Sequence, residues 1–243
     1  AFASPDVPTY GYKASGMTSV GADETALQAK LKDQCYNDLK SGMEVVRATD
    51  FGITHYDASD NYIKLQKAFD YIATHDAILY FEPSEGDEYY YTSRPIVLRG
   101  GATYRVFSQN GMIRASTTSA DIKNQGIFVM SADDNEPING YMYGLSMNMH
   151  DADTSGFYNV NMKDMYIKVG SIQRGLGVFT NCNIEDSIIT DGQMQYCYYG
   201  WFWKSTVKNT VITNVYGTAS VGEEKEDGIV PGMMSYRFFI STS

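Results

Sequence analysis

The sequence predicts a mostly β protein that folds as a short parallel β-helix, a solenoid whose successive turns stack along one axis. Two features predict this fold. In the second half of the chain, a pattern of two strand-like stretches without a helix recurs every 20 to 23 residues, and two columns of side chains align when the repeats are stacked. Such a repeat is too short for a propeller blade and lacks the leucine consensus of leucine-rich repeats. It fits one β-helix turn, which buries its apolar face against the next turn.

The first column consists of aromatic rings and follows from aligning the repeats on their glycines. The aligned segments are Gly156-Phe157-Tyr158-Asn159, Gly177-Val178-Phe179-Thr180 and Gly200-Trp201-Phe202-Trp203, with Gly126-Ile127-Phe128-Val129 as an earlier copy. Equivalent residues on stacked strands lie about 4.8 Å apart. The alignment therefore predicts an interior ladder of stacked rings. Its members are Phe128, Tyr158, Phe179 and Phe202.

The second column consists of charges that alternate in sign. Lys163, Glu185 and Lys208 recur at spacings of 22 and 23 residues, each one place after an apolar residue. Neighbours in the stack then carry opposite charges, which an exposed ladder of side chains favours. Further apolar positions keep the same spacing and are expected in the core. They are Met162, Ile184 and Val207, and then Ile167, Ile189 and Ile212.

Residues 1–44 are expected to precede the solenoid domain, which is assigned to 45–243. Residues 1–22 carry Pro, Gly, Ser and Tyr without a period, so we interpret them as an extended arm that needs something outside itself to pack on. Asp23 is a suitable N-cap for a helix over 23–39, which Gly42 ends. The leucines near one face of this helix are Leu27, Leu31 and Leu39.

A second helix is expected from about residue 60 to 74. Its apolar residues form a wide stripe, so it must cover a core. They are Ile63, Leu65, Ala68, Phe69 and Ile72. After this helix the sequence consists of short strand-like stretches separated by turn residues, beginning with "AILYFEP" at 77–83.

Composition limits the functions that the chain can have. The net charge of −10 argues against a nucleic-acid partner, because phosphates select basic surfaces. No apolar run is long enough to insert in a membrane. The three cysteines cannot all pair within the chain, and we expect three reduced thiols. His55, His75 and His150 are scattered, so neither a metal nor another cofactor is expected.

The segment from Val45 to Ala115 resembles the start of the pectate-lyase-like right-handed β-helix of phage tailspikes and related polysaccharide-degrading enzymes. The matching stretches are "ATDFGI" (48–53), "YDASDNYIKLQKAFDYIA" (56–73), "AILYFEPSEGDEYYYTSRPIVLRGGATYRV" (77–106) and "GMIRAS" (111–116). The resemblance implies a right-handed coil whose end is capped by the helix at about 60–74. Glu82 stands where the family usually has proline, and the turn "SEGDE" is longer and more acidic than is typical.

The resemblance also implies a function. A tailspike-like virion protein would be a homotrimer that docks to other tail proteins through residues 1–44 and recognises or degrades host polysaccharide with its β-helix. We weigh two alternatives. One is a free-standing, secreted polysaccharide lyase or glycoside hydrolase, and the other is a non-catalytic structural β-helix of a virion. The matching motifs are structural, so they identify the cap and the coil rather than the chemistry.

Asp164, Asp186 and Asp191 are the candidate catalytic residues. Glycoside hydrolysis needs two carboxylates on one surface, and Asp164 and Asp186 fall in one column with Asn209. A close acidic pair can have one raised pKa and serve as acid and base. The alternative interpretation is that this column marks the bend between two strands, where Asp and Asn bond to the backbone.

Tyr199, Trp201 and Trp203 are the candidate polysaccharide-binding residues. If Phe202 points inward, strand alternation directs Trp201 and Trp203 outward, where indoles can stack on sugar rings. Burial of these rings against a neighbouring subunit, or under a covering loop, is the alternative.

Overall fold

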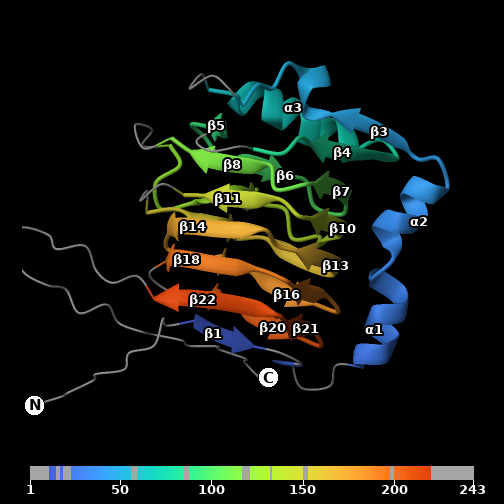
Figure 1. Cartoon of the computed structure of the whole chain (residues 1–243), viewed down its shortest axis with the longest axis vertical. Helices are drawn as coiled ribbons and strands as arrows, with labels where there is room; N and C mark the ends of the chain where they lie inside the picture. The colour runs from blue at the N-terminus through green and yellow to red at the C-terminus, as the bar shows by residue number, and fades with distance from the viewer. Residues whose placement is uncertain are drawn as a thin grey trace, which may run out of the picture.

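The structure is a computed structural model that describes residues 11–14, 17–18, 23–55, 60–84, 88–116, 121–131, 133–149, 153–197 and 200–219. Over these ranges the chain forms a mostly β, parallel, right-handed solenoid of about five turns, together with helices from its N-terminal region. Figure 1 shows the turns stacked one above another. The predicted fold class is therefore confirmed.

Three sheets form the sides of the solenoid. The seven-stranded sheet has the order β1 (Gly11–Ala14), β22 (Val215–Ala219), β18 (Gln193–Cys197), β14 (Ser171–Gly175), β11 (Ser146–Asn148), β8 (Met112–Ala115) and β5 (Tyr90–Thr92). The five-stranded sheet has the order β19 (Phe202–Trp203), β15 (Phe179–Thr180), β12 (Ser155–Tyr158), β9 (Gly126–Met130) and β6 (Ile96–Leu98).

The third sheet has ten strands. Its main path is β2 (Met17–Thr18), β21 (Val211–Thr213), β17 (Ile188–Thr190), β13 (Asn161–Lys168), β10 (Ile138–Tyr143), β7 (Thr103–Ser108), β4 (Ala77–Phe81) and β3 (Glu44–Arg47). Two more strands, β16 (Asn183–Glu185) and β20 (Thr206–Lys208), continue from β13 beside this path. Here the charge column is confirmed, because Lys163 pairs in register with Glu185 and Glu185 with Lys208.

The corners of the solenoid are made by residues in the left-handed backbone region. One column of corners is Asp164, Asp186 and Asn209, with φ of 55°, 49° and 46°. Asn and Asp adopt this conformation more readily than other residues that have a Cβ. A second column of corners is Asn159, Asn181 and Lys204, with φ of 55°, 54° and 52°.

The interior ring ladder exists, but one predicted member is wrong. Phe157, not Tyr158, pairs in register with both Phe128 and Phe179. The four rings of Phe128, Phe157, Phe179 and Phe202 stack with centroids 5.1–5.4 Å apart. Tyr158 pairs with Val129 and Thr180 instead and is partly exposed. Alignment on glycines fails because Gly156 precedes Phe157 directly, whereas Val178 separates Gly177 from Phe179.

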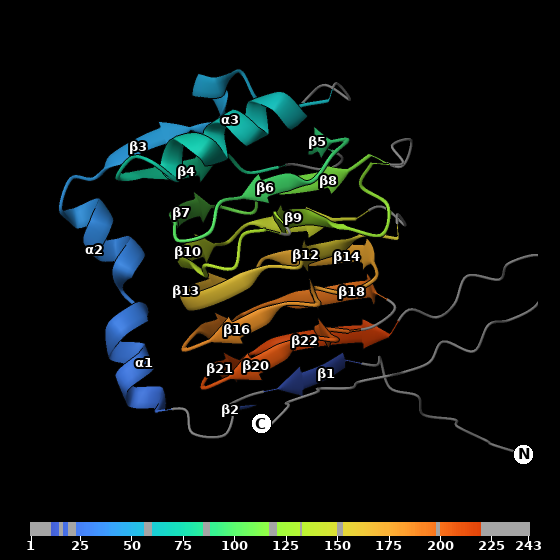
Figure 2. The same cartoon turned by 180° about the vertical axis from the view of Figure 1, so that it is seen from behind.

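Helix α3 (Tyr62–Ile72) closes one end of the solenoid, as expected for the second helix. It follows the short 3-10 helix η1 (Ala48–Phe51) and lies at the same end as β3 and β4 (Figure 2). The fully buried Phe69 places its ring 5.2 Å from that of Phe128, so the helix extends the interior ladder. This contact seals the apolar core against water.

The first predicted helix is two helices, α1 (Glu24–Leu31) and α2 (Gln34–Lys40). Asp23 is confirmed as an N-cap, since its carboxylate accepts a hydrogen bond of 2.9 Å from the Ala26 amide. Leu27 and Leu31 pack against the outer face of the ten-stranded sheet. Leu39, expected on the same face, is 43% exposed because the break after Leu31 takes it off the buried side.

The two helices form a strap along the outside of the stacked turns (Figure 1). α1 contacts β13 and β17, and α2 contacts β10. Before the strap, β1 pairs antiparallel with β22, and β2 pairs antiparallel with β21. Segments of the expected arm thus close the last turn of the solenoid at the end opposite α3 (Figure 2). The division at residue 44 and a role in virion attachment stay predictions.

The reactivity of the cysteines tests whether the interior is shielded from solvent. All three are free, with Cys182 and Cys197 buried and Cys35 partly exposed. Burial raises the pKa of Cys182 and of Cys197 to about 12. Near pH 8 both thiols are therefore protonated and shielded, and the thiolate is the reactive form. We expect a thiol reagent to label at most Cys35 in the native protein and all three cysteines in denaturant. Rapid labelling of three thiols without denaturant would contradict this.

Candidate functional site

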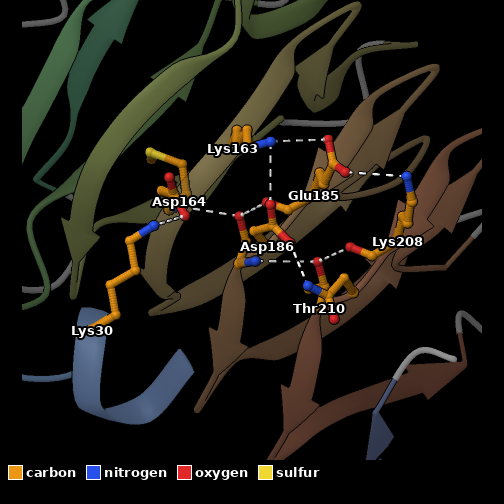
Figure 3. A network of polar contacts seen from close by, with 10 residues as sticks. Lys30, Lys163, Asp164, Glu185, Asp186, Lys208 and Thr210 are labelled. Atoms are coloured by element: carbon orange, nitrogen blue, oxygen red, sulfur yellow. Dashed lines mark hydrogen bonds and ion pairs between the residues drawn. The ribbon is translucent and has the colours of Figure 1, made fainter. Parts of the chain in front are cut away.

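A network of charged side chains crosses the ten-stranded sheet and reaches the strap (Figure 3). Lys30 on α1 binds the carboxylate of Asp164 at 2.5 Å. On the sheet, Lys163 lies 3.3 Å from Asp186 and 3.6 Å from Glu185. Because Lys163 and Glu185 are in register, the corner residues that follow them, Asp164 and Asp186, occupy equivalent places on consecutive turns. The structure thus brings two of the three predicted carboxylates into one network.

The environment of Asp186 favours its charged form. Burial alone would raise the pKa of this carboxyl, but the hydrogen bond from Asn209 and the nearby Lys163 ammonium outweigh burial, so the pKa is lowered. The pKa of Lys163 is raised in turn, mainly by its hydrogen bond to Asp186. A general acid must carry a proton near neutral pH. Asp186 is thus a poor proton donor and a good partner for a cation.

A polar pocket of about 410 Å³ lies between the strap and the sheet. Three cations and two carboxylates line it, namely Lys30, Arg105, Lys163, Asp38 and Asp164. Every one of these charges has a partner within the protein: besides the pairs above, Arg105 contacts Asp38 at 3.3 Å and Asp76 at 3.2 Å. These ion pairs hold the strap against the sheet. Because the charges are already paired, a charged ligand would find little unpaired charge in the pocket.

Asp191 lies apart from the other two candidates. It follows β17 directly, at the corner between the ten-stranded and seven-stranded sheets, with φ of 55°. Its carboxylate is 3.7 Å from the ammonium of Lys168. The three predicted carboxylates therefore do not form one cluster, and their catalytic role stays a prediction.

The predicted aromatic residues are arranged differently from the expectation. Trp201 does not point outward: its side chain is buried in the core, where a Cβ on Gly192 of the preceding turn would overlap the indole. Alternation fails here because Gly200, with φ of 82°, turns the chain just before this residue. Trp203 is partly exposed, and the Lys204 ammonium lies 4.6 Å from its ring centre. Tyr199 lies outside the described residues.

The outer face of the seven-stranded sheet holds a group of polar side chains that the sequence reasoning missed. Ser171 and Gln173 on β14 are in register with Gln193 and Gln195 on β18. We call these four residues the amide block. All four are at least partly exposed, and Gln173 donates a hydrogen bond of 3.1 Å to Ser171. The signal in the sequence was the pair of alternating stretches Ser-Ile-Gln and Gln-Met-Gln, 22 residues apart.

Aromatic and basic side chains continue the same face toward α3. Arg114 on β8 lies over the ring of Tyr89 at 4.6 Å and over that of Tyr91 at 5.6 Å. Such cation–π contacts hold a guanidinium in a defined orientation. Asn148 on β11 connects the two groups, because it pairs with Arg114 on one side and with Gln173 on the other. The face thus presents amides and a hydroxyl on β14 and β18, and an arginine with two tyrosines on and beside β8 and β5.

The solved structures that are similar to this chain include an iota-carrageenase and a Parabacteroides merdae protein. An iota-carrageenase in complex with iota-carrageenan fragments matches 72% of this chain and 42% of its own, with a TM-score of 0.46 and 15% identity. A Parabacteroides merdae protein with the proposed activity of a glycosyl hydrolase matches 72% of this chain and 96% of its own, with a TM-score of 0.39 and 12% identity.

No protein-family profile matches the chain, and no curated protein matches it. In the described ranges, no helix has both the length and the apolar character needed to cross a bilayer.

Proposed function

We propose that this protein binds a polysaccharide on the outer face of its seven-stranded sheet. The observation that carries the proposal is the amide block, in which polar side chains from β14 and β18 lie in register on a regular parallel sheet. Primary amides both donate and accept hydrogen bonds, as sugar hydroxyls do. A row of them can therefore follow a chain of sugars without large rearrangement. Tyr89 and Tyr91 add the apolar ring surface that glycan sites use beside polar groups.

Binding without cleavage is the activity that the geometry supports best. Asp164 and Asp186 lie on the ten-stranded sheet, away from the amide block, where Lys30 of α1 holds the first and Lys163 holds the second. Asp191 is the predicted carboxylate nearest to that block along the chain, and it is paired with Lys168. A free-standing lyase or hydrolase remains the alternative, and release of reducing or unsaturated sugar ends from a bound polysaccharide would support it.

The virion setting is a further proposal. In a tailspike-like protein, this face would recognise the host polysaccharide, and the tail would be reached through the N-terminal region. Because the strap and β1 lie against the solenoid, such an attachment would use their outer surfaces or residues 1–10. Light scattering at micromolar concentration tests the expected homotrimer, and a monomer there would contradict a tailspike-like assembly.

Replacing two residues of the amide block tests the binding face. In the variant Gln193→Ala with Gln195→Ala, we expect affinity for any polysaccharide retained on a glycan array to fall about tenfold or more, because each lost hydrogen bond contributes about 1 kcal/mol. Gln109→Ala removes an exposed amide elsewhere and is the matched control. The measurement is isothermal titration calorimetry, with thermal unfolding to confirm that the variants fold.

Two results would contradict the proposed face. One is equal affinity of the double variant and the native protein. The other is a glycan array on which the folded protein retains no polysaccharide.

A further inference from the structure

The three sheets differ in the charges that their strands carry. Within the described strands, the five-stranded sheet has no charged residue, and the ten-stranded sheet carries both signs. The strands of the seven-stranded sheet contain no Asp or Glu, and their charged residues are Lys13, Arg114 and Arg174. In a chain of net charge −10, this sheet is therefore a basic surface within an acidic protein.

Arg114 and Arg174 lie along the axis of this sheet rather than side by side. Arg114 is on β8 and Arg174 is on β14, with β11 between these strands. Two strand spacings separate them, or about 9.6 Å along the axis. Arg174 has a φ of 54° at the end of β14 and is exposed. The strand between them, β11, carries no charge, and its Asn148, which pairs with Arg114 and with Gln173, is buried.

We propose that the ligand is an acidic polysaccharide whose carboxylate-bearing sugars alternate with neutral ones, bound along the solenoid axis. This inference rests on the proposed function and names its ligand class. Arg114 and Arg174 bind carboxylates of the polysaccharide, because a guanidinium matches a carboxylate with two parallel hydrogen bonds. Between the two arginines lies β11, which carries no charge, and beyond Arg174 lies β18 with Gln193 and Gln195 of the amide block, so strands with and without a charge alternate along the axis and the uncharged ones meet the neutral sugars. A polymer with a charge on every sugar would place some of its carboxylates against neutral amides. Those carboxylates would lose their water without gaining an ionic partner, which costs binding free energy.

The charge distribution also sets how the complex responds to salt. The strands of this sheet meet an acidic polymer with basic groups only, although the chain as a whole is acidic. Asp191 borders the sheet at one corner, and Lys168 compensates its charge. Since ions screen exposed charges over distances of about 8 to 10 Å, added salt weakens this binding.

Four commercial polysaccharides separate the possible ligand classes by titration calorimetry. Hyaluronan carries a carboxylate on alternate sugars, polygalacturonate on every sugar, dextran sulfate carries sulfates, and dextran is neutral. We expect hyaluronan to bind most tightly and its affinity to fall as salt is raised. Arg114→Gln and Arg174→Gln should each weaken hyaluronan about fivefold, the scale of one exposed ion pair. Arg99→Gln, an exposed arginine outside the seven-stranded sheet, should change nothing.

The possible failures are distinct. If dextran binds as tightly as hyaluronan and its affinity does not depend on salt, the inference that the ligand is acidic is wrong. The proposal that the face binds a polysaccharide is then still supported. Tighter binding of polygalacturonate or dextran sulfate would overturn the alternating pattern. Arg174 is exposed, so we expect the Arg174→Gln variant to fold even if Arg114→Gln does not. Unchanged hyaluronan affinity in folded Arg174→Gln would overturn the role of Arg174 in binding a carboxylate. Absence of binding to any of the four and to a glycan array would overturn the proposed function as well.

Discussion

Replacing Phe179 by alanine is expected to lower the free energy of unfolding by about 3–5 kcal/mol, the range for a buried phenylalanine whose cavity cannot collapse. Phe179 is fully buried and stacks on the rings of Phe157 and Phe202, 5.1 and 5.4 Å away. Its loss leaves a gap between two turns whose spacing is fixed by backbone hydrogen bonds, so neighbouring rings cannot close it. Chemical denaturation followed by circular dichroism measures the effect.

Tyr158→Ala is the matched control for this prediction. Tyr158 is one of the rings that alignment of the glycines assigned to the interior, yet in the structure it is partly exposed and outside the ladder. Its replacement should cost about 1 kcal/mol, the average for point mutations. If Tyr158→Ala destabilised the protein as much as Phe179→Ala, the register of β12 would be wrong.

Gly140→Ala is expected to have a similarly large effect, a loss of about 2–6 kcal/mol in the free energy of unfolding. Gly140 has a φ of 111°, a conformation that residues with a Cβ rarely adopt, and this strain costs about 1–3 kcal/mol. A Cβ there would also overlap the backbone oxygen of Tyr104 on the adjacent strand, and overpacking of this kind costs about 1–3 kcal/mol more. Backbone cannot rotate aside as a side chain can. Thermal and chemical unfolding measure the change.

Gly42→Ala separates the two contributions. Gly42 has a φ of 81°, but no atom lies within 4 Å of where its Cβ would be. This variant should show the conformational strain alone, about 1–2 kcal/mol. Equal effects at the two glycines would mean that the close approach of β10 to β7 at Tyr104 contributes nothing.

Much of the core register could be predicted because a solenoid repeats its environment at every turn. Met162, Ile184 and Val207 pair in register as their spacing indicated, and so do Ile167, Ile189 and Ile212. The ring ladder was misplaced by one residue at Tyr158. The corner residues Asn159 and Asn181, at a spacing of 22 and both with positive φ, would have given the correct register.

The candidate site was harder to predict, because the spacing of residues along the sequence does not show which residues their side chains contact. The column of Asp164 and Asp186 was visible, but Lys30, which binds Asp164 from a helix on the outside, was not. Strand alternation predicted an outward Trp201. In the structure, the chain turns at Gly200 and the indole fills the space beside Gly192, so Trp201 is buried. The amide block was encoded in a simple alternation and was overlooked in favour of aromatic residues.

The amino-acid order by itself determined the solenoid, its capping helix and the alternating charges of Lys163, Glu185 and Lys208, since all three follow from periodicity within or between neighbouring turns. Only the tertiary structure showed that Gly11–Ala14 completes the last turn by pairing with β22, and that a strap of two helices covers one side. It also separated a sheet with only basic charges from one that carries both signs. These features depend on contacts between segments far apart in the chain, which no local pattern records.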